Sequence, residues 1–116
     1  MKNTQEVLDF SLTLPETYFE KPFKKYDAIA IKHKENHKWF ALIIDYQGRT
    51  LVNVKCHPDW TEFWRSRYDD VFPGYHMNKE HWNSIVIGGD VPDDDFKQMI
   101  FDSYHLTKEG KNKKLS

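Results

Sequence analysis

The chain has 116 residues, of which 39% are hydrophobic and 16% aromatic, and this length supports one compact domain that buries its own core. A mean hydropathy of -0.79, without any long apolar run, argues against a membrane-spanning segment. The formal net charge of -1 argues against the strongly basic domain that dedicated nucleic-acid binders use, although charge can still be segregated along the chain.

Two features favour a reducing, cytoplasmic location. Residues 1–6 contain no apolar signal-peptide core. The single cysteine, Cys56, has no partner for an internal disulfide. We further expect a monomer that needs no cofactor and no metal and that contacts no membrane.

The pattern of the first half of the chain predicts one helix followed by three strands. Asn3 and Glu6 have the spacing of a capping box, at the start of a helix that should end near Pro15. A connecting loop is expected over residues 18–23. The three strands are expected at residues 26–32, 39–44 and 50–55, and the middle one has the densest apolar run.

The second half predicts a helix, two short strands and a last helix. Pro58 suits the first turn of the second helix. Strands at 75–77 and 83–87 should flank a tight turn, and the last helix should begin near Pro92 with three aspartates in its first turn. The side chains spaced for one face of the second helix are Trp60, Phe63, Trp64, Arg67 and Tyr68.

The element order is therefore α-β-β-β-α-β-β-α. Strands clustered between helices and joined by hairpin-length loops predict an α+β fold, in which helices pack on an antiparallel sheet of about five strands. No linker or repeat divides the chain. We expect a single domain over residues 1–107 and a basic, flexible tail over residues 108–116.

Residues 75–85 combine hydrogen-bonding and aromatic side chains just before an apolar strand. They contain two histidines, two asparagines, a lysine, a tyrosine and a tryptophan. Each such polar group would cost about 1–3 kcal/mol if it were buried without a partner. The segment is therefore predicted to form a polar network at the edge of the sheet, or a surface that contacts a ligand.

The same segment carries a family resemblance. It has the order Tyr-His-Met-Asn-Lys, any residue, His-Trp-Asn, and after a short strand it continues with Gly-Asp-Val-Pro-Asp at residues 89–93. This order resembles the signature of the MmcQ/YjbR family, and the similarity extends to residues 39–42 and 52–56 within a span from about 4 to 106. The resemblance implies a small bacterial protein with a secretion-chaperone-like fold and "double-wing" hairpins. It also implies a non-enzymatic, DNA-binding role.

The residues themselves support no catalytic or metal site. Cys56, His57, His76 and His81 lack the spacing of a zinc site. A helix follows Cys56 and could lower its pKa, but a small buried residue is the more common role for such a cysteine. Residues 88–90 lack the Lys-Ser/Thr of a phosphate-binding loop.

Basic and amide side chains on the hairpins are the candidate DNA contacts. Lysine and arginine neutralise phosphates, and asparagine can bind adenine with two hydrogen bonds. Alternatively, Asn78 caps a local turn and His81 pairs with a backbone carbonyl. The predicted nucleic-acid-binding residues are Lys32, Lys34, Lys38, Arg49, His76, Asn78 and Lys79.

Two other classes remain open. A protein-binding adaptor would show an exposed apolar patch on the sheet. An enzyme or small-ligand binder would bring Cys56, His76 and His81 together in a deep pocket. A clustered basic face would instead favour DNA.

Overall fold

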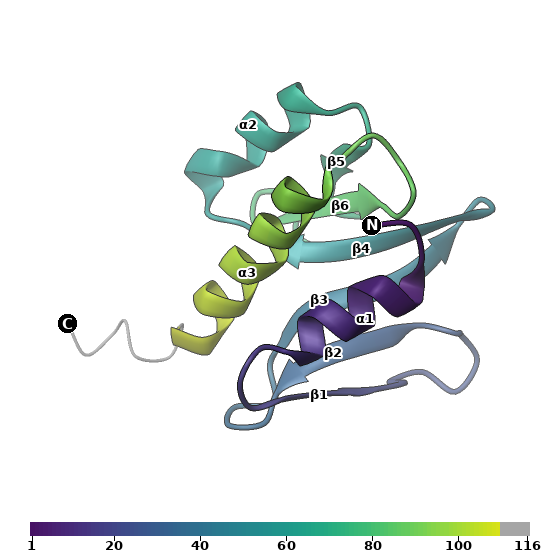
Figure 1. Cartoon of the computed structure of the whole chain (residues 1–116), viewed down its shortest axis with the longest axis vertical. Helices are drawn as coiled ribbons and strands as arrows, with labels where there is room; N and C mark the ends of the chain where they lie inside the picture. The colour runs from purple at the N-terminus through teal and green to yellow at the C-terminus, as the bar shows by residue number, and fades with distance from the viewer. Residues whose placement is uncertain (110–116) are drawn as a thin grey trace.

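The computed structural model describes residues 1–109, which form three helices and one six-stranded antiparallel sheet (Figure 1). The sheet order is β1-β2-β3-β4-β6-β5. The elements are α1 (Thr4–Leu12), β1 (Thr17–Glu20), β2 (Ile29–His33), β3 (Trp39–Tyr46), β4 (Arg49–Lys55), α2 (Pro58–Arg67), β5 (Val71–Pro73), β6 (Trp82–Val86) and α3 (Asp93–Glu109).

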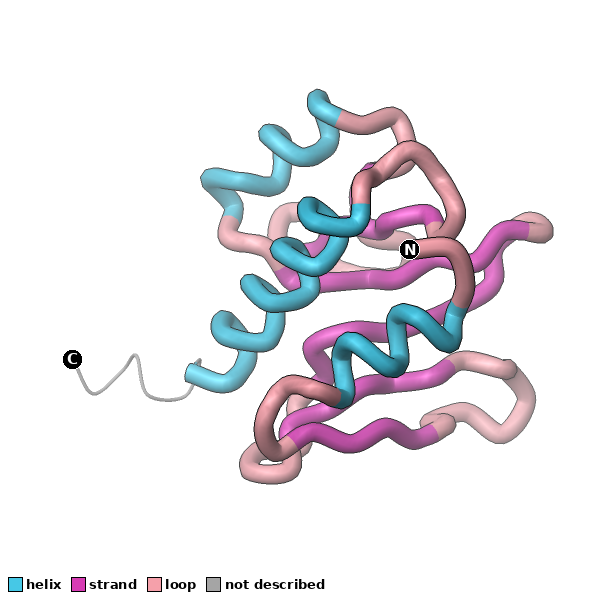
Figure 2. The backbone as a smooth tube through the Cα atoms, in the orientation of Figure 1, coloured by secondary structure: helices cyan, strands magenta, loops and turns pink. Residues whose placement is uncertain are grey.

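The helices cover one face of the sheet. Helices α1 and α3 lie across the strands on the side that faces the viewer, and α2 packs beside β5 and β6 (Figures 1 and 2). The main core lies between these helices and the sheet, with Phe40, Phe96 and Ile100 fully buried in it. Within residues 1–109 no helix covers the opposite face, which we call the open face.

A β-bulge gives β3 apolar side chains on both faces of the sheet. The register against β2 shifts so that Ile31 pairs with Ala41 while Lys32 pairs with Trp39. Phe40 is the extra residue, and both Phe40 and Ala41 pack in the helix-side core. Trp39, Leu42 and Ile44 belong to a second, smaller apolar cluster with Ala28, Ala30 and Met77 on the open face.

The predicted α+β fold is confirmed, including all three helices. Asn3 caps α1 by accepting a hydrogen bond from the Glu6 amide at 2.9 Å, and the Glu6 carboxylate accepts from the Lys2 amide at 2.9 Å. Pro58 opens α2 as expected. Helix α3 begins with its three aspartates in the first turn.

Two strands lie outside the predicted positions. Residues 17–20 form edge strand β1, although a loop was predicted at 18–23, because pairing with β2 orders a short stretch without apolar alternation. Strand β5 covers Val71–Pro73 rather than the predicted 75–77, because the backbone of Tyr75 is bound instead by side chains on β4 and β6.

The predicted apolar face of α2 is only partly buried. Trp64 and Thr61 face the core, whereas Trp60 and Phe63 are exposed. Helix α3 continues to Glu109, two residues beyond the predicted domain end. The rest of the predicted flexible tail, 110–116, lies outside the described residues.

A buried histidine joins the end of β2 to the last turns of α3. His33 packs between the rings of Phe40 and Tyr104, at centroid distances of 5.0 and 4.8 Å. Its Nε2 lies 2.7 Å from the Thr107 hydroxyl. Burial lowers the pKa of His33 below its ordinary 6.5, and the charge of Lys108 adds to this effect.

This depressed pKa makes stability depend on pH near neutrality. Unfolded His33 takes up its proton at about pH 6.5, before the folded form does, so the free energy of unfolding should fall as the pH drops below 6.5. Urea denaturation from pH 7.5 to 5 should show a steeper loss for the wild type than for His33→Gln. The control is His76→Gln, at an exposed position on the opposite face of the sheet, which should keep the pH dependence of the wild type. A pH dependence in His33→Gln as steep as that of the wild type would contradict the assignment.

Candidate functional site

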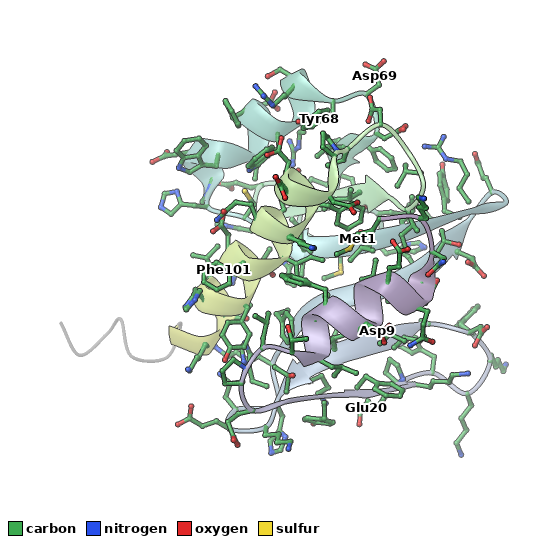
Figure 3. All side chains as sticks on the ribbon, viewed as in Figure 1. Met1, Asp9, Glu20, Tyr68, Asp69 and Phe101 are labelled. Carbon is green, nitrogen blue, oxygen red and sulfur yellow. The ribbon has the colours of Figure 1, made fainter. Side chains whose placement is uncertain are left out.

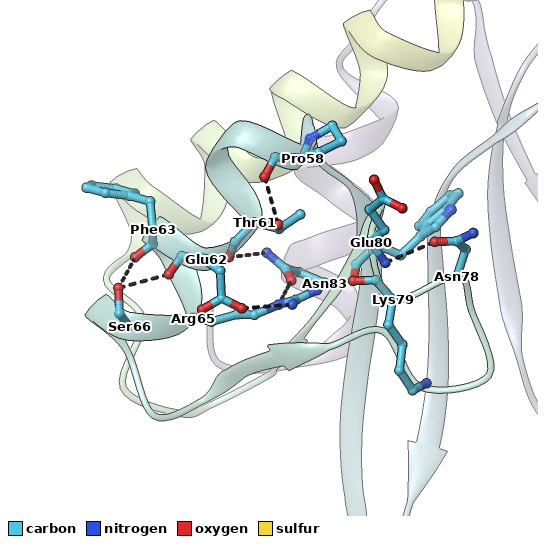
Figure 4. Close-up of polar contacts among 11 residues, drawn as sticks. Pro58, Thr61, Glu62, Phe63, Arg65, Ser66, Asn78, Lys79, Glu80 and Asn83 are labelled. Carbon is cyan, nitrogen blue, oxygen red and sulfur yellow. Dashed lines mark hydrogen bonds and ion pairs between the residues drawn. The ribbon is translucent and has the colours of Figure 1, made fainter.

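The segment between β5 and β6 folds over the open face because Arg65 of α2 holds it there. Arg65 Nε donates to Asn83 Oδ1 at 2.7 Å, and Nη2 donates to the backbone oxygens of Lys79 and, at 3.3 Å, Trp82 (Figure 4). The Arg65 side chain is only 15% exposed. One guanidinium therefore ties the helix to β6 and to the turn before it.

Asn78 and Lys79 are occupied by this local structure. The Asn78 carboxamide accepts from the Glu80 amide at 2.9 Å, as a turn cap does. The Lys79 ammonium donates to the Gly74 carbonyl at 2.8 Å. The turn-capping alternative for Asn78 fits this geometry, and the backbone carbonyl of His81, rather than its ring, accepts from the Cys56 amide at 2.7 Å.

A second network fixes Tyr75 on the open face. Asn53 on β4 donates to the Tyr75 carbonyl at 2.9 Å, and the Tyr75 amide donates to the Ser84 hydroxyl at 2.9 Å. Ser84 in turn donates to Asn53 Oδ1. Asn53 and Ser84 are both fully buried, so these bonds satisfy polar groups that would otherwise destabilise the sheet.

Between the β1–β2 loop and residues 75–77 the open face is hollowed into a groove of about 570 Å³. Its floor is apolar and includes Ala28, Leu42 and Ile44. This volume lies within the range of about 300–1,000 Å³ typical of ligand sites. A second, much smaller hollow of about 10 Å³ lies beside Cys56 and Trp64.

Aromatic side chains form both walls of the groove. On one wall the ring of Phe23 packs edge-to-face against the rings of Trp39 and Tyr26, at centroid distances of 6.2 and 6.1 Å. On the other wall the ring centroids of Tyr75 and His76 lie 4.0 Å apart. His76 has a φ of 62°, a left-handed conformation that is uncommon for a residue with a Cβ.

The predicted cations do not form one patch. Lys32 pairs with Glu20 at 2.8 Å, and this hydrogen bond raises the pKa of the lysine. Arg49 pairs with Asp70 at 3.3 Å. Lys34 and Lys38 are exposed and form no ion pair within residues 1–109, but their turn lies at the opposite end of β3 from Arg49.

Two lysines beside the groove were missing from the predicted set. Lys25 lines the groove, and Lys24 lies between it and Phe23 in the β1–β2 loop. Both are exposed and have no ion-pair partner among the described residues. The signal that could have identified them is the alternation of lysine with aromatic residues in the stretch Phe23-Lys24-Lys25-Tyr26.

Charge is segregated in this part of the molecule. Residues 20–39 contain six lysines and three acidic residues, although the whole chain has a net charge of -1. The three aspartates 93–95 lie at the start of α3, on the helix-bearing side of the sheet. The loops that border the open face therefore carry a local positive excess.

Cys56 does not join a reactive cluster. It is buried in the helix-side core, where burial and the nearby Asp102 raise the pKa of its thiol to about 11. His76 lines the groove on the opposite face of the sheet. No group of three or more metal-ligating side chains occurs in residues 1–109, and no helix there combines the length and apolar character needed to cross a bilayer.

The sequence profile of the YjbR family matches residues 12–106. The chain belongs to the YjbR family. The YyaQ protein of Bacillus subtilis is 37% identical over 75% of this chain and 82% of its own length. The YjbR protein of Escherichia coli K12 is 32% identical over 66% of this chain and 68% of its own length.

Solved structures share the fold of this chain. A Pseudomonas syringae protein superposes with a TM-score of 0.85 at 28% identity, covering 90% of this chain and 98% of that one. A Deinococcus radiodurans protein superposes with a TM-score of 0.83 at 24% identity, covering 95% of this chain and 82% of that one. The second likeness shows the shared fold alone.

The position of Arg65 makes its replacement informative. Arg65→Lys keeps the charge but loses the fork of donors, and should lower the free energy of unfolding by about 1–3 kcal/mol because the buried Asn83 oxygen loses its donor. Urea denaturation measures this change. The matched control is Arg67→Lys on the same helix, where the side chain is 54% exposed, and it should change the free energy of unfolding by less than about 0.5 kcal/mol. If both variants lowered the free energy of unfolding equally, the structural role of Arg65 would be refuted.

Proposed function

We propose that this YjbR-family protein is a non-enzymatic DNA-binding protein that contacts DNA through its open face. The observation that carries the proposal is the positive excess of residues 20–39 beside an aromatic groove, with the aspartates of α3 on the other side of the sheet. Such segregation lets a chain of nearly neutral net charge attract a polyanion.

Four lysines are the principal phosphate contacts in this proposal. Lys24 and Lys25 lie in the β1–β2 loop, and Lys34 and Lys38 in the β2–β3 turn. All four are exposed and have no ion-pair partner within residues 1–109. The β2–β3 turn is anchored, since Asn36 donates to the Thr107 carbonyl at 3.1 Å, so its lysines need little ordering on binding.

The other predicted contacts have smaller roles. Lys32 and Arg49 would have to exchange an acidic partner for a phosphate, which reduces their net contribution. Asn78 and Lys79 hold the turn that supports the groove wall. His76 is exposed on that wall and is the member of the signature best placed to touch a ligand.

The lining residues of the groove support the part of the proposal that excludes catalysis. The groove contains no cysteine, serine or threonine among its lining residues, and Cys56 lies on the other face of the sheet with a raised pKa. His76 therefore has no thiol or aliphatic hydroxyl in the groove to activate as a nucleophile.

Binding of a partner protein is the second candidate. The apolar lining of the groove, which includes the exposed Phe23 and the half-buried Trp39 and Ile44, favours it, because exposed apolar surface often marks a protein-binding site. The two candidates differ in their response to salt: contacts between lysine and phosphate weaken steeply as ionic strength rises, whereas apolar contacts do not.

The lysine contacts predict a measurable salt dependence. Fluorescence anisotropy with labelled DNA from 25 to about 200 mM salt should show the logarithm of the association constant falling linearly with the logarithm of salt concentration. Removing two phosphate contacts in Lys24→Ala/Lys25→Ala, or in Lys34→Ala/Lys38→Ala, should reduce the slope by about 1 per lysine.

The control is Lys97→Ala on α3, which removes one exposed lysine from the helix-bearing side and should leave the slope unchanged. DNA binding is ruled out by a wild-type protein that shows no affinity at the lowest salt concentration. A slope that Lys97→Ala reduces as much per lysine as the double variants do would rule out the open face as the contact surface.

A further inference from the structure

We infer that the groove takes unpaired bases of single-stranded DNA, so that this protein prefers a single strand to a duplex. The inference rests on the proposed DNA binding and adds the form of DNA and the residues that would hold its bases. It depends on the aromatic walls, the apolar floor and the lysines that border them, none of which is explained by phosphate contacts alone.

The aromatic walls provide surfaces on which bases can stack. Tyr26 is 70% exposed and Phe23 is 42% exposed, although both lie next to the apolar cluster of the open face. Their rings meet at 83°, edge-to-face, so they do not cover each other as a stacked pair would. Exposed ring faces beside a positively charged segment are the combination that single-strand-binding proteins use.

A duplex could not use these rings. In a duplex the faces of the bases are stacked against one another, and only their edges and the phosphates are accessible. The groove floor, by contrast, is hydrophobic and lies between two walls, where an inserted base would displace water from the half-buried Ile44 and Trp39. Only a base that is not paired can enter in that way.

Charge favours a nucleic acid over a peptide as the occupant. Lys25 lines the groove, Lys24 precedes it in the loop, and Lys38 directly precedes the wall residue Trp39. Lysines in these positions can follow a phosphate backbone past the bases. An apolar peptide segment would use the floor but would leave these ammonium groups without partners.

Two carboxylates also line the groove, where each would face a base while the phosphates follow the lysines. Asp27 is paired with Lys21 at 3.1 Å, which offsets its charge. Asp45 accepts from the Thr50 hydroxyl at 3.2 Å. A carboxylate beside a stacked base can accept a hydrogen bond from an exocyclic amino group, as occurs with cytosine N4.

The test compares one labelled 20-nucleotide strand of mixed sequence, without self-complementarity, with the same strand annealed to its complement. Anisotropy titrations of the full chain should give tighter binding to the single strand. Phe23→Ala and Tyr26→Ala should each weaken single-strand binding about fivefold or more, because each removes a stacking surface. Neither should change duplex binding or the salt slope, since no charge is lost.

Phe101→Ala is the matched control. Phe101 is 42% exposed, as Phe23 is, but it lies on α3 on the helix-bearing side (Figure 3). Its removal should leave both affinities unchanged. Circular dichroism of each variant should show that the fold is retained, because Phe23, Tyr26 and Phe101 are all exposed.

A site-specific signal completes the experiment. The indole N–H resonance of Trp39, identified by its absence in Trp39→Phe, should shift when the single strand binds.

Two outcomes overturn the inference and leave DNA binding intact. One is a Trp39 resonance that does not shift at saturation. The other is equal binding to single strand and duplex that neither Phe23→Ala nor Tyr26→Ala weakens. Absence of binding to either form refutes the proposed function itself. Peptides selected from a random library that shift Trp39, when the oligonucleotide does not, would assign the groove to a protein segment and also overturn the inference.

Discussion

The fork of hydrogen bonds from Arg65 is the interaction on which the open face depends. A planar guanidinium can donate in several directions at once, and here it reaches a buried carboxamide and a backbone oxygen of β6 and one backbone oxygen of the preceding turn. Without it, the turn at Asn78–Lys79 would lose its hydrogen bond to α2, and the wall formed by Tyr75 and His76 would rest on the bonds of Tyr75 to Asn53 and Ser84. A residue on the helix-bearing side therefore determines the shape of the surface on the other side.

The signature of the family divides into two groups of side chains with different tasks. The side chains of Asn78, Lys79 and Asn83 form hydrogen bonds with backbone groups and so stabilise the local fold. Tyr75 and His76 point their rings into the groove wall, with the backbone of Tyr75 held by buried polar groups on β4 and β6. The mixture of polar and aromatic residues thus serves both alternatives that the sequence offered, a network at the sheet edge and a surface for a ligand.

Charge placement explains how a chain of net charge -1 can attract an anion. The aspartates that start α3 are favourable there because they lie at the positive end of the helix dipole. Their position also keeps them on the helix-bearing side, away from the loops of residues 20–39. Within those loops, Glu20 and Asp27 each pair with a lysine, and further lysines remain exposed. The local balance of charge, rather than the total, is the relevant quantity for binding.

The sequence by itself determined the helices, their caps, most of the strands, the antiparallel α+β class and the family, because these depend on local spacing and on an ordered signature. It also indicated the importance of residues 75–85. Tertiary structure alone decided the site. Edge strand β1, the fold of the 21–28 loop against Trp39, and the partners of Lys32, Arg49 and Arg65 all depend on contacts between residues far apart in sequence. Local spacing carries no information about such contacts. The predicted set of cations therefore included Lys32 and Arg49, which are paired with acidic residues, and it omitted Lys25, which lines the aromatic groove.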